Sequence, residues 1–256
     1  MKKIDTLVTA VGGEGGRLSD YFKAVNFNNT KTLWSINGQP LLKYLIDAAF
    51  SVGLKRVFLL ASFYEKEVRE FADKFYKNQN VIVVSGGDEG KKEGVNRVLS
   101  FIKDQLKEPF IYSDGDVLFD RKLLEDLSDI SKTKDFLVKC VISPEDQALT
   151  HSRFIIDNDH ISQIDLRYAN SPKESVEERE CYCSLGLMVI NNNVFDSLPQ
   201  YKDMKDLDVL VKKLFCKNRD SIDYKIYEGD WFSIHTKEDI DKIANGYYDE
   251  LLRSLT

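Results

Sequence analysis

Two groups of residues in the first half of the chain have the types and spacing that phosphate chemistry requires. In the first, the segment Val11-Gly12-Gly13-Glu14-Gly15-Gly16-Arg17-Leu18, four glycines fall within five positions and an arginine follows at once. Glycines let backbone N–H groups approach a phosphate closely, and the guanidinium group of an arginine can bind two phosphate oxygens together. A tight turn accounts for one or two of these glycines. Four glycines before an arginine predict a phosphate-binding loop.

The second group is Asp114-Gly115-Asp116, which directly follows an apolar run at residues 110–113. Carboxylates at positions i and i+2 of an extended backbone point to the same side, and the glycine between them permits a turn at the end of a strand. Carboxylate oxygens beside a polyphosphate are typical ligands of Mg²⁺, which completes its coordination shell with water and phosphate oxygens. The group therefore predicts a magnesium site, and the plainer interpretation is a charged β-turn.

The elements that must position these residues alternate between two hydrophobic periods. Short β-branched apolar runs predict strands, and longer amphipathic segments predict helices. Strands are predicted at residues 4–10, 57–61, 81–85 and 110–113, and helices at residues 41–50, 65–75 and 93–106. Such a series builds a parallel sheet with helices on both faces, which binds ligands at the carboxyl ends of its strands. Both candidate groups follow predicted strands directly.

The second half of the chain has a different pattern, with more strands and a hairpin signal at Asp157-Asn158-Asp159. Strands are predicted at residues 136–142, 154–156, 161–166, 183–190, 224–227 and 231–234, and helices at residues 123–130, 206–216 and 237–252. We therefore expect one α/β domain over residues 1–256, a Rossmann-like three-layer α/β/α sandwich with a mixed, mainly parallel sheet. Residues 1–120 would form its nucleotide-binding half, and residues 121–256 an acceptor-binding half with a small β region.

Composition and charge limit the class of partner. The 256 residues include 36 Lys+Arg and 42 Asp+Glu, which give a formal net charge of −6. Nucleic-acid binding depends on clustered basic residues, so the acidic balance argues against a nucleic-acid partner. The most continuous apolar run, residues 57–63, is far shorter than the ~20 residues that cross a bilayer, and no secretory leader is apparent. We expect no membrane insertion and a cytoplasmic location, and a homo-oligomer stays open.

The cysteines carry no metal-site pattern. Zinc sites need C-x-x-C or histidine partners at suitable spacing, and this chain has neither. Reduced thiols in the core are therefore expected at Cys140, Cys181, Cys183 and Cys216.

The glycine loop matches neither common phosphate motif, because Leu18 stands where G-x-G-x-x-G needs a glycine and the Gly-Lys-Ser/Thr of the P-loop is missing. Its wider context resembles the sugar-phosphate nucleotidyltransferases, which join a sugar 1-phosphate to a nucleotide. That family has G-G-x-G-T-R-L, then P-K-x-L, then G-x-P-L-[IL] at the start of a helix. The corresponding segments here are Gly12 to Leu18, Thr30-Lys31-Thr32-Leu33 and Gly38-Gln39-Pro40-Leu41-Leu42. Order and spacing agree, with Gly16 in place of threonine and Thr30 in place of proline.

The resemblance implies roles for these residues. Arg17 and Lys31 would be catalytic and bind the phosphates of a nucleoside triphosphate, while Asp116 would bind Mg²⁺ with Asp114 as a second contact. The reaction needs positioning and charge neutralisation rather than a covalent enzyme intermediate. The nucleotide contacts are expected at Ala10, Val11, Gly12, Gly13, Glu14, Gly15, Gly16 and Gly94, the last in a Gly94-Val95-Asn96 segment that replaces the family's G-T-A.

The second half departs from the family pattern at two places. Ser233 replaces the second metal-binding aspartate of a W-x-D-I-G-T strand, and His235 replaces its glycine; nearby Asp230 is a candidate substitute for the aspartate. The sugar-binding E-K-P element falls near residues 164–167, where Leu166 replaces the glutamate. The acceptor contacts implied are Arg167, which keeps the basic role, Gly186, which would let the acceptor approach the backbone, and His235, for which a structural role stays open.

The leading hypothesis is a Mg²⁺-dependent nucleotidyltransferase that joins an NTP and a sugar 1-phosphate, for polysaccharide synthesis. Two alternatives remain. Asp-x-Asp after a parallel strand also marks glycosyltransferases of related fold, although those enzymes generally lack the arginine-bearing loop. The replacements at Ser233 and Leu166 would suit a non-catalytic regulatory subunit that binds a nucleotide sugar.

Overall fold

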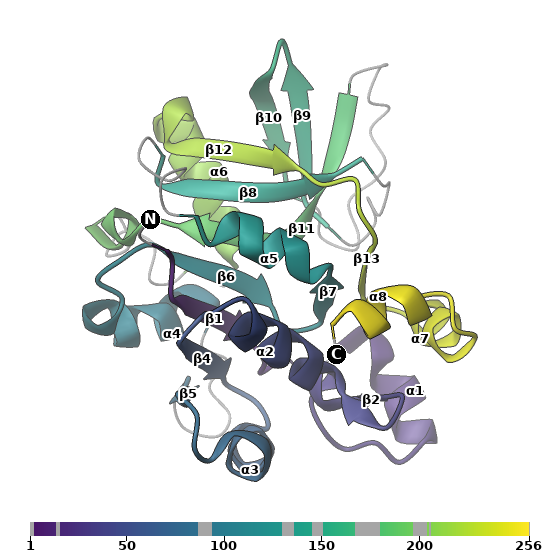
Figure 1. Cartoon of the computed structure of the whole chain (residues 1–256). Coiled ribbons are helices and arrows are strands. Elements are labelled where there is room, and N and C mark those ends of the chain that lie inside the picture. Colours follow the sequence, from purple (N-terminus) through teal and green to yellow (C-terminus); the bar gives the residue numbers. More distant parts are fainter. Residues whose placement is uncertain are drawn as a thin grey trace.

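The computed structural model describes residues 3–13, 16–86, 94–129, 136–144, 151–166, 180–196, 204 and 206–255. Over these ranges the chain forms a mixed central sheet of nine strands with helices on both faces (Figure 1). The strands of this sheet are β1 (Thr6–Ala10), β4 (Arg56–Ala61), β5 (Val81–Ser85), β6 (Phe110–Asp114), β8 (Val138–Ser143), β9 (Arg153–Asp157), β10 (His160–Asp165), β11 (Glu180–Ile190) and β12 (Ile222–Ile226). The α/β sandwich expected from the sequence is confirmed.

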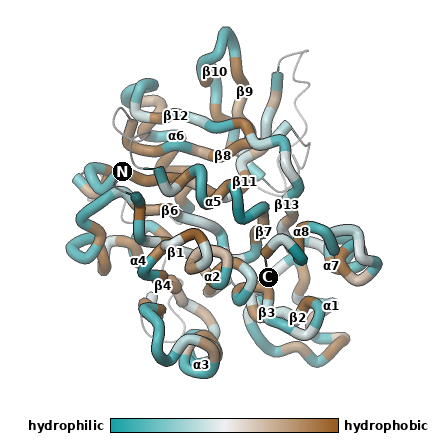
Figure 2. The backbone as a smooth tube through the Cα atoms, in the orientation of Figure 1, coloured by the Kyte–Doolittle hydropathy of each residue, from teal (hydrophilic) through white to brown (hydrophobic). Residues whose placement is uncertain are grey.

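The first half of the chain supplies four parallel strands, in the order β6-β1-β4-β5, and β8 and β12 of the second half form a further parallel pair. Successive side chains of a strand point to opposite faces, so Leu7 and Val8 of β1 enter two different apolar clusters. On one face lie α2 (Leu41–Ser51), α3 (Glu65–Tyr76) and α5 (Arg121–Leu127), and on the other lie α4 (Val95–Ile102) and α6 (Leu207–Lys217). Figure 2 shows hydrophobic residues along the central strands, while the tip of the β9–β10 hairpin is hydrophilic.

The second half of the chain joins this sheet through the long strand β11. Its C-terminal part pairs antiparallel with β6, and its N-terminal part pairs with β9. Its pairing with β8 is interrupted between Ser184 and Met188, around Gly186, whose φ is +67°. A left-handed backbone conformation favours glycine, so this residue is needed where β11 changes partners.

A two-stranded ribbon fixes the C-terminal segment against the centre of the molecule. Strand β13 (Trp231–Ser233) pairs antiparallel with β7 (Val117–Phe119), and Ser233 lies opposite Val117. This pairing brings residues 233–235 beside Asp116, although more than 100 positions separate them in the sequence. A second small ribbon of β2 (Ser35–Ile36) and β3 (Gln39–Pro40) precedes α2.

Two expectations about the second half are wrong. The predicted closing helix at residues 237–252 is two helices, α7 (Lys237–Ala244) and α8 (Asp249–Ser254), because Gly246 takes a φ of +76° between them. The four cysteines are free thiols as expected, but Cys216 is exposed on α6 rather than in the core. Among the described residues, no helix combines the length and the apolar character that crossing a bilayer requires.

Candidate active site

The glycine loop leaves the end of β1 and enters the short helical segment Gly16–Leu18, which continues into α1 (Ser19–Ala24). The described glycines of the loop, Gly12, Gly13 and Gly16, have different surroundings. A Cβ on Gly12 would lie 2.2 Å from the backbone N of Ser62, so this glycine lets the loop pack against the end of β4. A Cβ on Gly13 or Gly16 would meet no described atom within 4 Å. These two positions therefore have room for a bound group beside the backbone, as a phosphate-binding loop requires.

The loop borders two neighbouring cavities. The larger one measures about 420 Å³, and the smaller one about 270 Å³. Gly13, Lys31 and His235 line both of them. The larger cavity is also lined by Ala10, Gly12, Thr32, Leu60, Ser62, Phe63, Gly94, Val95, Val98, Asp114, Asp116 and Asp206, and the smaller one by Gly16, Arg17, Leu18 and Ile234. Lys31 and His235 thus stand at the junction of the two spaces.

Two buried threonines position Lys31. The Thr30 hydroxyl donates a hydrogen bond of 2.8 Å to the carbonyl oxygen of Val11, and the Thr32 hydroxyl lies 3.4 Å from the same oxygen. These contacts tie the lysine segment to the glycine loop from both sides. Val11 itself is fully buried and contributes its carbonyl to this tie rather than a surface to either cavity. The threonine in place of the family's proline therefore keeps a positioning function.

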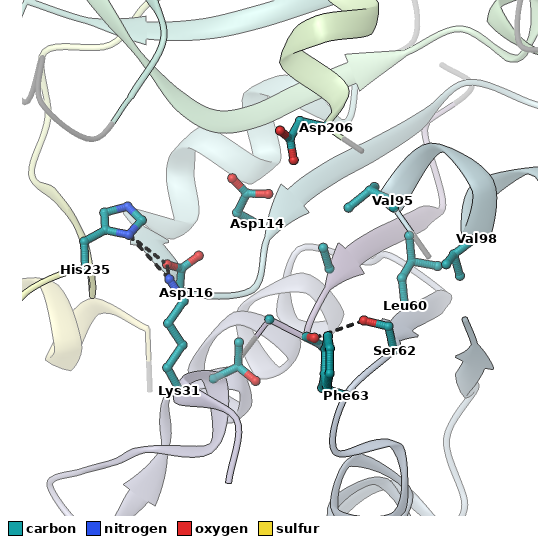
Figure 3. Close-up of a pocket in the computed structure, with 15 residues that line it drawn as sticks. Lys31, Leu60, Ser62, Phe63, Val95, Val98, Asp114, Asp116, Asp206 and His235 are labelled. Atoms are coloured by element: carbon teal, nitrogen blue, oxygen red, sulfur yellow. Dashed lines mark hydrogen bonds and ion pairs between the residues drawn. The ribbon is translucent and has the colours of Figure 1, made fainter. Parts of the chain in front are cut away.

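The ammonium group of Lys31 reaches from the first half of the chain to the C-terminal segment. It forms an ion pair with the carboxylate of Asp116 and donates a 3.2 Å hydrogen bond to the carbonyl oxygen of Ile234. It also lies 3.4 Å from Nδ1 of His235 (Figure 3). One cation therefore joins three groups around the junction of the cavities.

The two aspartates of Asp114-Gly115-Asp116 line the same cavity, and the turn that Gly115 permits lies between them. Asp114 ends β6, and Gly115 and Asp116 form the turn before β7. A Cβ on Gly115 would lie 2.7 Å from the carbonyl oxygen of Ala10. The glycine therefore lets the turn pack against the end of β1, so both strand ends meet at the cavity.

The surroundings shift the two carboxyl groups in opposite directions. Burial and the neighbouring charge of Asp116 raise the pKa of Asp114, whose Oδ1 accepts a 2.7 Å hydrogen bond from the Tyr112 hydroxyl. Burial has the largest single influence on Asp116 and opposes its ionisation, but the charge and the hydrogen bond of Lys31, together with the neighbouring histidines, lower the pKa of that carboxyl. Asp116 therefore enters the site as a carboxylate with a cation beside it. Asp114 ionises less readily until another cation approaches.

The imidazole of His235 is held in place by the start of α7. Its backbone N–H donates a 2.9 Å hydrogen bond to the side chain of Asp239, which also completes a capping box with Thr236. Burial lowers the pKa of the ring to about 3, with the nearby Lys31 adding to the effect and Asp116 opposing it. His235 is therefore a neutral polar group at the junction of the cavities.

Other predicted residues are placed differently. Gly186 lines neither cavity: a Cβ there would lie 2.3 Å from an oxygen of Asp114, so the structure explains this glycine by its contact with that carboxylate. Asp230 is exposed and directly precedes β13, at the opposite end of that strand from Ser233. It lines neither cavity, so it does not take the place of the missing aspartate. Glu14, Gly15 and Arg167 lie outside the described residues.

Sequence reasoning missed five residues that border the larger cavity: Leu60, Ser62, Phe63, Val98 and Asp206. Ser62 and Phe63 directly follow β4, so the rule that ligands bind at the carboxyl ends of parallel strands could have found them. Asp206 precedes α6, and its side chain accepts no capping hydrogen bond from that helix. Figure 3 shows it facing the same space as Asp114.

The carboxylate oxygens around Asp116 suit a hard cation that also takes phosphate oxygens of a substrate as ligands. Two carboxylates reach the larger cavity at the turn, and among the described residues no cluster of three or more His, Cys, Asp or Glu side chains could hold a metal ion on its own. Mg²⁺ is commonly held by one or two carboxylates, with water and phosphate oxygens in its remaining positions. The residues present therefore fit this ion, with a bound phosphate as part of its coordination shell.

Comparison with known proteins places this site in a known fold. No protein-family model and no curated protein matches the sequence. The inositol-1-phosphate CTP transferase from T. maritima superposes with a TM-score of 0.77 at 18% identity, over 98% of this chain and 96% of that chain. The chain has the fold of the sugar-phosphate nucleotidyltransferases. A UDP-glucose pyrophosphorylase solved with UDP-glucose superposes with a TM-score of 0.72 at 14% identity, over 96% of this chain and 99% of that chain.

The nucleotidyltransferase fold agrees with the resemblance read from the glycine loop and the lysine segment. The resemblance rests on short motifs, whereas the structural likeness rests on the path of nearly the whole chain. At these identities the structural likeness establishes the fold alone. The reaction must therefore be argued from the site of this chain.

Proposed function

We propose that this chain transfers a nucleotidyl group from a nucleoside triphosphate to the phosphate of a sugar or polyol 1-phosphate and releases pyrophosphate. The observation that carries the proposal is the junction of the two cavities, where Lys31 and His235 line both spaces and Asp116 lies beside them. A triphosphate must reach in two directions from its reacting phosphorus, toward its nucleoside and toward its leaving group. Two connected spaces meeting at a cation provide such an arrangement.

The larger cavity has one apolar and one polar end. Leu60, Val95 and Val98 line the apolar end, which suits a nucleobase, while Asp114 and Asp116 lie at the polar end (Figure 3). Asp206 faces the polar end from the second half of the chain. Carboxylates accept hydrogen bonds from hydroxyl groups, which supports a hydroxyl-rich acceptor.

The smaller cavity suits the leaving group. Gly13 and Gly16 border it with open space beside their backbone, and Arg17 lines the same cavity. Backbone N–H groups and a guanidinium group are typical binders of phosphate oxygens. We therefore assign the β- and γ-phosphates to this space, which puts the α-phosphate near Lys31.

The reaction then requires no covalent intermediate on the protein. An oxygen of the acceptor phosphate forms a bond to the α-phosphorus, the bond from that phosphorus to the bridging oxygen breaks, and its electron pair leaves with pyrophosphate. The attacking oxygen is already anionic, so no general base is needed. Lys31 neutralises charge on the reacting phosphate, and Arg17 holds the leaving group in line. Asp116 and Asp114 would hold Mg²⁺, which when bound would supply positive charge to the phosphate oxygens.

The test is pyrophosphate release. The protein is incubated with each of the common NTPs, Mg²⁺ and a panel of hexose and inositol 1-phosphates, and pyrophosphate is measured with a coupled enzyme. We expect release with at least one pair and a loss of about a thousandfold or more in Asp116→Asn, because that change removes the carboxylate that binds the cation and orients Lys31. Asp104→Asn, an exposed aspartate after α4, is the matched control and should keep full activity.

Two outcomes would contradict the proposal. No release with any pair would refute the transferase and would favour a subunit that only binds a nucleotide sugar, which equilibrium dialysis with labelled nucleotide sugars would detect. Transfer of a glycosyl group from a nucleotide sugar, with no reaction of any NTP, would instead show a glycosyltransferase. Unchanged activity in Asp116→Asn would remove this residue from the cation site.

A further inference from the structure

The ring of His235 belongs to a row of polar side chains that continues away from the cavities. Its Nε2 lies 3.3 Å from Nε2 of His151, a buried residue just before β9, and the two rings meet edge to face with centroids 4.8 Å apart. The Ser233 hydroxyl lies 3.4 Å from the same nitrogen of His151. The Trp231 ring packs against His151 from another side, with centroids 5.4 Å apart. This histidine is therefore fixed by packing as well as by polar contacts.

These contacts determine where the ring protons lie. An ammonium group has three N–H donors and no acceptor, so Nδ1 of His235, 3.4 Å from Lys31, must accept. The carboxylate of Asp116 is 3.6 Å from that nitrogen, too far for a hydrogen bond. A ring that accepts at Nδ1 carries no proton on that nitrogen, so the proton of the His235 ring lies on Nε2. That proton faces Nε2 of His151, which therefore accepts it.

We propose that His151 is a positioning residue, which accepts a hydrogen bond from Nε2 of His235 and so keeps the unprotonated Nδ1 of that ring directed at Lys31. In the opposite arrangement, Nε2 of His151 would donate the hydrogen bond and Nε2 of His235 would accept it. Nδ1 of His235 would then carry the ring proton, and this N–H would face the N–H donors of the Lys31 ammonium group. The buried histidine disfavours this arrangement when its Nε2 is the unprotonated ring nitrogen, because it then offers an acceptor on the other side of the His235 ring. The Ser233 hydroxyl lies 3.4 Å from the same nitrogen, so the N–H of His235, at 3.3 Å, is the nearer donor to its single lone pair.

The consequence for function rests on the proposed function. Lys31 has two side-chain partners at the junction, Asp116 and His235, and a cation bound to Asp116 competes for the first of them. Nδ1 of His235 keeps an acceptor beside Lys31 when that happens. In the family that the chain resembles, aspartate and glycine stand where Ser233 and His235 stand here, so the imidazole pair belongs to this chain's own version of the site.

The first test reads the protons directly and needs neither substrate nor metal. The chain contains only three histidines, so ¹⁵N-histidine labelling followed by long-range ¹H–¹⁵N correlation spectra can be fully assigned. We expect His235 as the tautomer with the proton on Nε2 and His151 as the tautomer with the proton on Nδ1. A spectrum with the His235 proton on Nδ1 would overturn the proposal, whatever the protein catalyses.

Matched variants separate positioning from packing. His151→Phe keeps an aromatic ring between Trp231 and His235 but offers no acceptor, whereas His151→Asn offers a carbonyl oxygen. In His151→Phe we expect the His235 signals to lose their single tautomer while the thermal unfolding midpoint stays close to that of the wild type, and His151→Asn should restore the tautomer. His160→Ala, in the exposed β9–β10 hairpin, is the control that should leave the His235 signals unchanged.

Steady-state kinetics of the same variants test whether the His235 tautomer affects catalysis. If Lys31 acts on the reacting phosphate, His151→Phe should lower kcat by about ten- to a hundredfold, the usual effect of a small misplacement, with KM for the NTP nearly unchanged, and His151→Asn should recover most of the loss. A wild-type kcat in His151→Phe, or a loss confined to KM, would overturn the positioning role. Failure of the proposed function itself would appear as no activity in the wild type, while the spectra would still decide the arrangement of the protons.

Discussion

Replacing Asp114 by asparagine should change how the stability of the protein depends on pH. In the folded chain, burial and the charge of Asp116 raise the pKa of this carboxyl from 3.8 to about 7. Between these two values the folded state binds one proton more than the unfolded state, so the free energy of unfolding falls as the pH rises, by about 1.4 kcal/mol per pH unit. The contribution is fully present below pH 3.8 and is lost as the pH passes the folded pKa.

The size of the effect follows from the part of this window that an experiment can cover. Between pH 5 and the folded pKa of about 7 the wild type should lose about 3 kcal/mol from this group. Asparagine does not titrate in this range, and its amide oxygen can still accept the hydrogen bond from Tyr112. Asp114→Asn should therefore become more stable relative to the wild type as the pH rises.

Urea unfolding at half-unit steps from pH 5 to pH 8.5, in buffer with a chelator, measures this difference. The free energy of unfolding of the wild type is subtracted from that of Asp114→Asn at each pH. Asp104→Asn, at an exposed position, should give a difference that stays flat. A flat or falling difference for Asp114→Asn would show that this carboxyl is already ionised in the folded chain, and the electrostatic account of the turn would be refuted. A rising difference would also imply that a cation binding to Asp114 releases a proton.

Two further predictions concern the ion pair and the glycine loop. Lys31→Met should lower kcat at least a hundredfold in the pyrophosphate assay. It should also destabilise the protein by about 2–3 kcal/mol in urea at pH 8, because it leaves the buried Asp116 carboxylate without its cation. Wild-type stability of this variant would show that the ion pair contributes nothing. Gly13→Ala should fold normally but raise KM for the NTP, since its Cβ enters the space assigned to phosphate. Gly12→Ala should lower the unfolding midpoint, because its Cβ meets the backbone of Ser62. Equal effects of the two alanines on folding would contradict this division of the loop.

The sequence predicted those parts of the fold and site whose signals are local. Strand β6 and the turn after it are neighbours in the chain, so an apolar run followed by Asp114-Gly115-Asp116 indicates both the strand and its acidic end, which lines the larger cavity. The break of the last helix also has a local signal, Asn245-Gly246. The helical spacing of apolar residues continues past it and predicts one helix instead. The packing of the turn after β6 against the end of β1, by contrast, depends on contacts that no local pattern contains.

The residues around Lys31 show why the remainder of the site could not be predicted. His235 was identified only as a departure from a motif, because a histidine between apolar residues and a helix cap carries no signal of its own. Its partner His151 comes from a segment more than 80 positions earlier, and the two meet because β13 pairs with β7 while β9 pairs with β11. A hydrogen-bonded pair formed by two independent strand pairings leaves no spacing in the sequence. Ser233 in place of an aspartate therefore looks like a loss in the sequence, whereas in three dimensions its hydroxyl lies 3.4 Å from the same His151 nitrogen that His235 contacts.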